Sequence, residues 1–171
     1  GVEFLVDRFF YKDRYDYRQT IHTFSMSVNK LKEFADVSRL TVGTSVHTLN
    51  LAGGCLFVRS QSGGWEVSAA QGILADPDKQ ARLVSLLAHR ESLMEFPNSA
   101  SGANPDVAFL IPLMVGETEA GILFLSRKLL RQEFSSNDEY LLQGLISVAA
   151  GALRSAMLIR DVSVRDTFVS I

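Results

Sequence analysis

The sequence has little cysteine, no excess of charge of either sign and no long apolar run. Cys55 is the only cysteine among 171 residues, which excludes an internal disulfide framework and a multi-cysteine metal site. Lys and Arg total 17 and Asp and Glu total 19, so the chain lacks the excess of cations that nucleic-acid binding requires. The longest apolar run, Val107–Val115, is much shorter than the ~20 residues of a membrane span. We therefore expect no nucleic-acid partner and no membrane span.

Sequence motifs for catalysis and metal binding are also missing. No Gly-x-Gly-x-x-Gly or Walker-type loop occurs that would hold phosphates. No histidine is followed by an acidic residue, as in a phosphoacceptor helix, so phosphotransfer is not expected from these residues. His22, His47 and His89 lie on separate predicted helices without the i, i+4 spacing of a metal site. Haem binding through one axial histidine stays an open alternative, but we expect no cofactor and no enzymatic activity.

Two further candidates for chemistry are better explained by structural roles. Cys55 begins a predicted core strand, and a lone buried cysteine behaves as a small hydrophobe. A reactive thiolate needs cationic, partly exposed surroundings, and no His or Lys lies nearby in the sequence. Glu117 and Glu119 lie in a predicted hairpin loop, where carboxylates are usually solvated. We therefore expect no catalytic and no metal-binding residues.

The composition is that of a folded domain. With 47% hydrophobic and 21% charged residues, the chain can bury a substantial core, and its length suits one domain with an appended helix. We expect a linker or signalling helix over residues 1–35, a domain over residues 36–158 with a C-terminal dimerisation helix at about 137–164, and a tail over residues 165–171. The first residue is Gly1 and not Met, so we interpret the sequence as a fragment and infer no targeting signal from its ends.

The hydrophobic pattern predicts helices at both chain ends and strands between them. Apolar residues recur at helical spacing from Tyr17 to Leu31 and from Val42 to Leu49. Short apolar or alternating runs bounded by turn residues are typical of strands. The expected strands are Cys55–Arg59, Trp65–Ala70, Ser92–Phe96, Val107–Val115 and Gly121–Ser126, with a short helix over Asp78–Arg90.

The connections between the strands predict a largely antiparallel sheet, because short loops join strands into hairpins. The expected hairpin loops are Ser60–Gly64 and Gly116–Ala120. The second hairpin should be central, since its strands are apolar on both faces. The helices at the two chain ends are expected to pack together on one face of the sheet. The fold class is therefore α+β, in two or three layers.

The last predicted helix carries a wider apolar arc than contact with one sheet requires. Ser136 and Glu139 match a capping box, whose side chains satisfy backbone donors at the helix start. Either the whole arc is buried within the chain, or one stripe packs on the sheet and another on a second copy. We expect the second arrangement, a homodimer in a parallel four-helix bundle with two helices from each protomer. The expected contact residues are Leu145, Ala149, Ala152 and Ala156.

From Asp36 to Arg154 the order of elements resembles a GAF domain, the small-ligand sensor and dimerisation module of signalling proteins. The stretches that carry the resemblance are Gly53–Val58 with the Gly63-Gly64 hairpin, Phe109–Leu113 with Gly121–Leu125, and Arg127–Glu139 with the Leu-rich helix that follows. The resemblance implies a GAF-like, PAS-related α+β fold with a central, mainly antiparallel sheet. It also implies that the N- and C-terminal helices pack on one face of that sheet.

Many GAF domains carry Asn-Lys, a spacer and then Phe-x3-Asp-Glu before the last helix. The chain keeps Lys128, Phe134, Asp138 and Glu139 and has Arg127 where the Asn would stand. The resemblance implies a structural role for these four residues, with a supporting ion pair between Lys128 and Asp138 and no direct ligand contact. The missing Asn argues against a cyclic-nucleotide ligand and leaves the fold unaffected.

The segment Asp7–Arg18 alternates aromatic and charged residues. It resembles a linker that precedes the GAF domain in some bacterial membrane-bound sensor histidine kinases, where it follows the last transmembrane helix. The resemblance implies that the parent is a membrane-associated sensor histidine kinase of a two-component system. The fragment would then lie in the cytoplasm, with the other domains of the parent as its partners.

These expectations define a regulatory, sensory module that relays input through its terminal helices. A small-molecule pocket would lie between the sheet and the segment Asp78–Asp106, and its ligand is unknown. Two alternatives stay open. One is a degenerate GAF spacer that binds no ligand and only transmits helix motion. The other is a GAF-fold small-molecule redox enzyme, against which the single cysteine counts.

Overall fold

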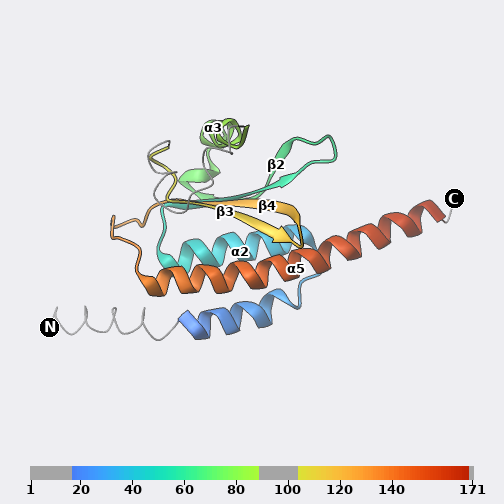
Figure 1. Cartoon of the computed structure of the whole chain (residues 1–171), viewed down its shortest axis with the longest axis horizontal. Helices are drawn as coiled ribbons and strands as arrows, with labels where there is room; N and C mark the ends of the chain where they lie inside the picture. Colours follow the sequence, from blue (N-terminus) through green and yellow to red (C-terminus); the bar gives the residue numbers. More distant parts are fainter. Residues whose placement is uncertain (1–16, 89–103, 170–171) are drawn as a thin grey trace.

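The computed structural model describes residues 17–88 and 104–169, with the surroundings of their side chains as far as residue 156. Residues 1–16 of the linker or signalling helix expected over residues 1–35 lie outside the described residues, as does the expected strand Ser92–Phe96. Figure 1 shows one sheet with helices on both of its faces. This arrangement confirms the α+β fold class.

A four-stranded antiparallel sheet lies at the centre of the described structure. Each neighbouring pair of strands is antiparallel, as the short hairpin connections predicted. The five-residue loop expected at Ser60–Gly64 joins the first two strands. The strands are β1 (Gly53–Arg59), β2 (Trp65–Gly72), β3 (Phe109–Val115) and β4 (Thr118–Leu125). Their order across the sheet is β2-β1-β4-β3.

The β3–β4 hairpin is not central, contrary to the expectation. β4 lies between β1 and β3, whereas β3 borders only β4 among the described strands. β3 contains Pro112, which has no N–H to donate and therefore suits an outer strand. The hairpin turn is also shorter than expected, since the ladder reaches Val115 and Thr118 and leaves only Gly116 and Glu117 between them. Gly116 supplies the positive φ that such a two-residue turn needs.

Helices form layers on the two sides of the sheet. α3 (Pro77–Ala88) and the short 3-10 helix η1 (Ile73–Ala75) cover one face, and α2 (Phe34–Leu49) and α5 (Ser136–Val169) lie side by side on the other (Figure 1). A further helix covers residues 17–28 and is called the N-terminal helix below. It packs on the outer side of α5, so that α5 lies between it and the sheet (Figure 1). Both end helices therefore lie on one side of the sheet, as expected.

Two apolar cores lie on opposite faces of the sheet. The larger core joins α2, α5 and the N-terminal helix to the sheet and includes the fully buried Leu145. The smaller core joins α3 and η1 to the other face. Successive side chains of β4 alternate between them, with Leu123 and Leu125 in the larger core and Ile122 and Phe124 in the smaller. Because both faces are covered here, β4 is apolar on both sides from Ala120 to Leu125.

α5 is longer than predicted. The helix was expected to end near residue 164 and to be followed by a tail, whereas it continues to Val169. Neither Gly nor Pro occurs between Met157 and Val169, so no helix-breaking residue interrupts it. In Figure 1 the C-terminal part of α5 extends beyond the sheet and the other helices. Among the described helices, none combines the length and the apolar character needed to cross a membrane.

Candidate functional site

The segment that joins β4 to α5 is held against the start of β1. Lys128 of this segment forms an isolated antiparallel β-bridge with Leu51, which lies just before β1. The backbone hydrogen bonds of this contact run from Ser126 N–H to Gly53 O (2.9 Å), from Ala52 N–H to Arg127 O (2.8 Å) and from Leu129 N–H to Asn50 O (2.8 Å). These bonds fix the backbone position from which the side chain of Lys128 reaches α5.

The structure brings Lys128 and Asp138 together. Lys128 Nζ lies 2.7 Å from Asp138 Oδ2, and the two side chains are only 13% and 14% exposed. An ion pair so well shielded is screened by salt less than an exposed one. Lys128 Nζ also lies 5.4 Å from the centre of the Phe134 ring, within cation–π range. Phe134 packs edge-to-face on Phe109 of β3, with ring centres 4.4 Å apart, and so links the pair to the larger core.

The capping box of α5 lies one residue earlier than the sequence indicated. Ser135 Oγ accepts a hydrogen bond from the Asp138 N–H (3.2 Å), and Asp138 Oδ2 accepts one from the Ser135 N–H (2.8 Å). Asp138 therefore takes the part expected of Glu139, which lies exposed, and Ser135 takes the part expected of Ser136. One carboxylate thus caps α5 and pairs with Lys128.

Arg127 stands where the GAF pattern has Asn. Its Nη1 donates to the Lys128 carbonyl oxygen at 3.2 Å, and its side chain is half-buried. The guanidinium therefore supports its own segment, and the ion pair between Lys128 and Asp138 forms without the Asn.

The residues predicted to contact a second copy are all buried within the single chain. Leu145 and Ala149 are fully buried, and Ala152 and Ala156 are 8% and 2% exposed. Leu145, Ala149 and Ala152 belong to the larger core, which also includes residues of α2 and the N-terminal helix. The apolar arc of α5 is wide because the helix contacts the sheet on one side and other helices of its own chain on the others.

The N-terminal helix packs on α5 in parallel. The rings of Tyr17 and Tyr140 stack with centres 6.5 Å apart, and one turn further along both helices Ile21 lies against Gly144. A Cβ atom on Gly144 would lie 2.4 Å from Ile21 Cδ1, so the absence of a side chain permits this close approach. Phe24 continues the contact into the larger core. The sequence predicted that the two helices pack together and that small residues of the last helix, Gly144 among them, permit close approach. That approach was expected from a second copy, whereas at Gly144 the structure shows it with the N-terminal helix of the same chain.

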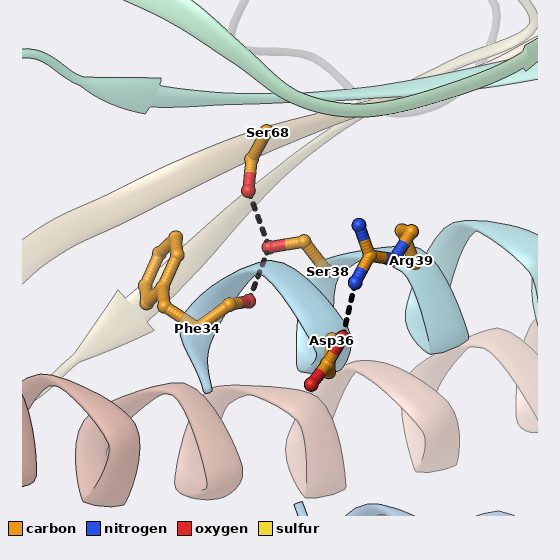
Figure 2. A network of polar contacts seen from close by, with 5 residues as sticks. All are labelled: Phe34, Asp36, Ser38, Arg39 and Ser68. Atoms are coloured by element: carbon orange, nitrogen blue, oxygen red, sulfur yellow. Dashed lines mark hydrogen bonds and ion pairs between the residues drawn. The ribbon is translucent and has the colours of Figure 1, made fainter. Parts of the chain in front are cut away.

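A network of hydroxyl groups fastens α2 to β2 (Figure 2). Ser68 Oγ donates to Ser38 Oγ at 2.6 Å, and Ser38 Oγ donates to the Phe34 carbonyl oxygen at 2.9 Å. Thr41 and Ser45 are also buried and donate to backbone carbonyls one turn earlier in α2. Sequence analysis missed this polar stripe, although the spacing of the three residues along the helix would have indicated it.

The face of the sheet beneath α3 is where a small-molecule pocket was expected. Part of the expected segment, residues 89–103, lies outside the described residues. At the boundary of that part, Lys79 of α3 pairs with Asp106 at 2.9 Å and ties α3 to the start of β3. The described part of this face is filled by the smaller core, whose buried members are Cys55, Phe57, Leu74, Leu83, Leu87, Val107, Leu110, Ile122 and Phe124.

Cys55 is a core residue of this face. Its side chain is fully buried, and burial raises the pKa of its thiol from 9.0 to about 12. A thiol that stays protonated is a poor nucleophile and a poor metal ligand. The structure therefore gives no support to a redox role for Cys55.

The remaining candidates for chemistry are dispersed. His22 and His47 are exposed on different helices, Glu117 is exposed at the β3–β4 turn, and His89 lies outside the described residues. Within residues 17–88 and 104–156, no group of three or more His, Cys, Asp or Glu side chains is placed to hold a metal ion. What the contacts described above have in common is structural, since they join the helices to the sheet and to each other.

Neither a known protein family nor a curated protein matches the sequence, but solved structures do. One is the GAF domain of a candidate sensor histidine kinase from Pseudomonas syringae pv. tomato, with a TM-score of 0.66 and 15% identity over 90% of this chain and 96% of that one. Another is the GAF domain of the potassium sensor histidine kinase KdpD from Escherichia coli, with a TM-score of 0.63 and 15% identity over 85% and 99% of the two chains. A third is the GAF domain of a phosphoenolpyruvate-protein phosphotransferase from Acinetobacter, with a TM-score of 0.61 and 17% identity over 82% and 93%.

The chain therefore has the fold of GAF domains, as the resemblance in its sequence implied. Sequence identities of 15 to 17% show the fold alone. The similar structures include domains from a phosphotransferase as well as from kinases, so the fold by itself does not select one kind of parent protein.

Proposed function

We propose that this chain is a non-catalytic regulatory module of a bacterial sensor histidine kinase in a two-component system, located on the cytoplasmic side of a membrane. In this proposal it relays movement between its two end helices. The observation that supports the relay most strongly is the parallel contact of the N-terminal helix with α5, made by Tyr17 on Tyr140 and Ile21 on Gly144. A displacement of the first helix acts directly on the second, and this coupling needs no ligand.

The anchoring of α5 suits a relay. Its first turn is closed by the capping box and is tied through the pair between Lys128 and Asp138 to the segment held against the start of β1. Its C-terminal part extends beyond the other elements (Figure 1). A packed interface tends to switch between discrete arrangements and not to deform continuously. When the N-terminal helix shifts, the first turn of α5 would therefore stay in place while the projecting C-terminal end of α5 changes direction.

The relay is tested in the parent protein with Ile21→Ala, which removes the side chain that lies on Gly144. We expect kinase output to lose most of its response to input, because the two helices lose the contact of Ile21 with Gly144. Met26→Ala is the matched control, since Met26 lies on the same helix and is 54% exposed. A normal response in Ile21→Ala, or an equal loss in Met26→Ala, would show that the contact does not carry the signal.

A GAF spacer that binds no ligand is the second candidate, and the packing beneath α3 favours it. Phe57 and Phe124 meet edge-to-face there with ring centres 5.7 Å apart, and Leu83 of α3 is fully buried against the same core. The helix relay is the same in both candidates. A ligand on this face would act only by binding one arrangement of the helices more tightly than another.

We further propose that the module works as a homodimer, with the outer surfaces of the N-terminal helix and α5 in contact between protomers. Leu145, Ala149, Ala152 and Ala156 are covered by the chain itself, so in this dimer they hold the helices of one protomer together. The outward face of α5 carries small exposed residues such as Ser147 and Gly151, which permit close approach of another helix.

Sedimentation equilibrium of the chain at increasing concentration tests this dimer. We expect a dimer whose dissociation constant rises about tenfold or more in Ser147→Arg, because a buried unpaired charge opposes association. Ser85→Arg is the matched control, since Ser85 is also exposed but lies on α3, on the other side of the sheet. A chain that stays monomeric at every concentration, or equal effects of the two substitutions, would contradict the proposed interface.

A further inference from the structure

The tip of the segment between β4 and α5 exposes two adjacent leucines. Leu129 is 54% and Leu130 is 73% exposed. They are the central residues of a turn that is closed by a hydrogen bond from the Arg131 N–H to the Lys128 carbonyl oxygen (3.0 Å). Central positions of turns usually carry Gly, Asn, Asp, Ser or Pro. The turn itself therefore gives no reason for two large apolar side chains at this tip.

The backbone holds the turn in this exposed arrangement. On its N-terminal side Lys128 is paired with Asp138, and the Leu129 N–H donates to the Asn50 carbonyl oxygen at 2.8 Å. On its C-terminal side Arg131 adopts a left-handed conformation with φ of 57°, which is uncommon for a residue other than glycine. The leucines are thus presented by a fixed support, which lowers the entropy cost of docking them elsewhere.

Cationic residues flank the two leucines. Arg131 is exposed and Arg127 is half-buried, and Glu133 is the nearest acidic residue in the sequence that follows. The charge of Lys128 is balanced by Asp138. An apolar tip with arginines beside it is complementary to an anionic bilayer, because the leucines can enter the interface while the guanidinium groups stay at the lipid phosphates.

The turn lies at the end of the molecule where the N-terminal helix begins. Lys128 is tied to Asp138 in the first turn of α5, and Tyr17 lies on Tyr140 close to the same turn. The chain that precedes Tyr17 therefore joins the molecule at this end. In a membrane-associated parent this end would face the bilayer, and that orientation rests on the function proposed above.

We propose that the Leu129–Leu130 turn is a membrane-contact site that enters the interface of an anionic bilayer. Arg131 binds lipid phosphates beside it, and Arg127, whose Nη1 donates to the Lys128 carbonyl oxygen, adds positive charge at the base of the turn. The contact holds the start of α5 against the membrane surface. A movement of the N-terminal helix then occurs relative to a fixed point.

The test is co-sedimentation of the chain with vesicles of phosphatidylglycerol and phosphatidylcholine at low salt. We expect binding to these anionic vesicles to fall about tenfold in the double variant Leu129→Gln/Leu130→Gln, because the variant has lost the apolar surface that enters the interface. Met114→Gln is the matched control, since Met114 is 45% exposed and lies at the opposite end of the sheet, next to the β3–β4 turn. It is expected to bind like the unmodified chain.

A spectroscopic measurement locates the contact. In a Trp65→Phe background, which removes the only tryptophan, Leu130→Trp places a single reporter at the tip. Its emission is expected to shift to shorter wavelength on anionic vesicles and to be quenched by brominated lipids. No binding above that to pure phosphatidylcholine, an equal loss in Met114→Gln or an unquenched reporter would each overturn the proposal. The assay uses the isolated chain, so its failure is distinguishable from a failure of the relay, which is measured as kinase output.

Discussion

Asp138→Ala is expected to lower the free energy of unfolding by about 3 kcal/mol. The substitution removes the partner of Lys128 in a pair whose side chains are only 13% and 14% exposed, and it leaves that ammonium group poorly solvated beside the ring of Phe134. It also leaves the Ser135 N–H without its carboxylate acceptor. Urea denaturation at neutral pH measures the change.

Three variants separate the two contributions of Asp138. Asp138→Asn keeps an oxygen that can accept from the Ser135 N–H and removes the charge, so it should lose about half as much stability. Ser135→Ala removes only the cap hydroxyl and should cost about 1 kcal/mol. Glu139→Ala changes an exposed side chain and should stay within about 0.5 kcal/mol. A larger loss in Glu139→Ala than in Asp138→Ala would restore the capping box expected from the sequence and contradict the one described.

The outline of the fold was predictable because its signals are local. Alternating and helical spacing of apolar residues marked the strands and helices, and short polar loops marked the hairpins. The predictions that were wrong concern alternatives between which the local sequence pattern does not distinguish. Ser135 and Ser136 are the same residue type, and Asp138 and Glu139 carry the same charge. Which serine caps α5 therefore depended on where the chain leaves β4. The outer position of β3 depended on strand order, for which Pro112 was the available signal.

The candidate site was predictable only where a resemblance supplied long-range information. The contact between Lys128 and Asp138 depends on the path of the intervening loop, and no periodicity encodes that path. The arc on α5 was visible in the sequence, but a helix of the same chain and a helix of a second copy bury such an arc equally well. The structure shows that Leu145 and Ala149 are covered within one chain. The close approach of Ile21 to Gly144 depends on how two distant helices are rotated against each other, which composition does not specify.

Gly144→Leu is expected to detach the N-terminal helix from α5. A Cβ alone would lie 2.4 Å from Ile21 Cδ1, and a leucine side chain is too large for the terminal methyl group to make room by rotation. Such overpacking typically costs 1–3 kcal/mol, and we expect about 3 kcal/mol here because Phe24 and Val28 also lose their contacts with the larger core. Hydrogen exchange should show loss of protection over residues 17–28, while the sheet keeps its protection.

Gly151→Leu is the matched control for this substitution. Gly151 lies on the same helix, and no atom lies within 4 Å of the position its Cβ would take, so the added side chain meets no neighbour. Measured at a concentration at which the chain is monomeric, it should stabilise the chain by about 0.8 kcal/mol through helix propensity alone. Ile21→Ala in the Gly144→Leu background should restore protection over residues 17–28, because the smaller side chain makes room for the leucine. If Gly144→Leu leaves that protection unchanged, the N-terminal helix does not depend on this contact, and the relay proposed from it has no mechanical basis.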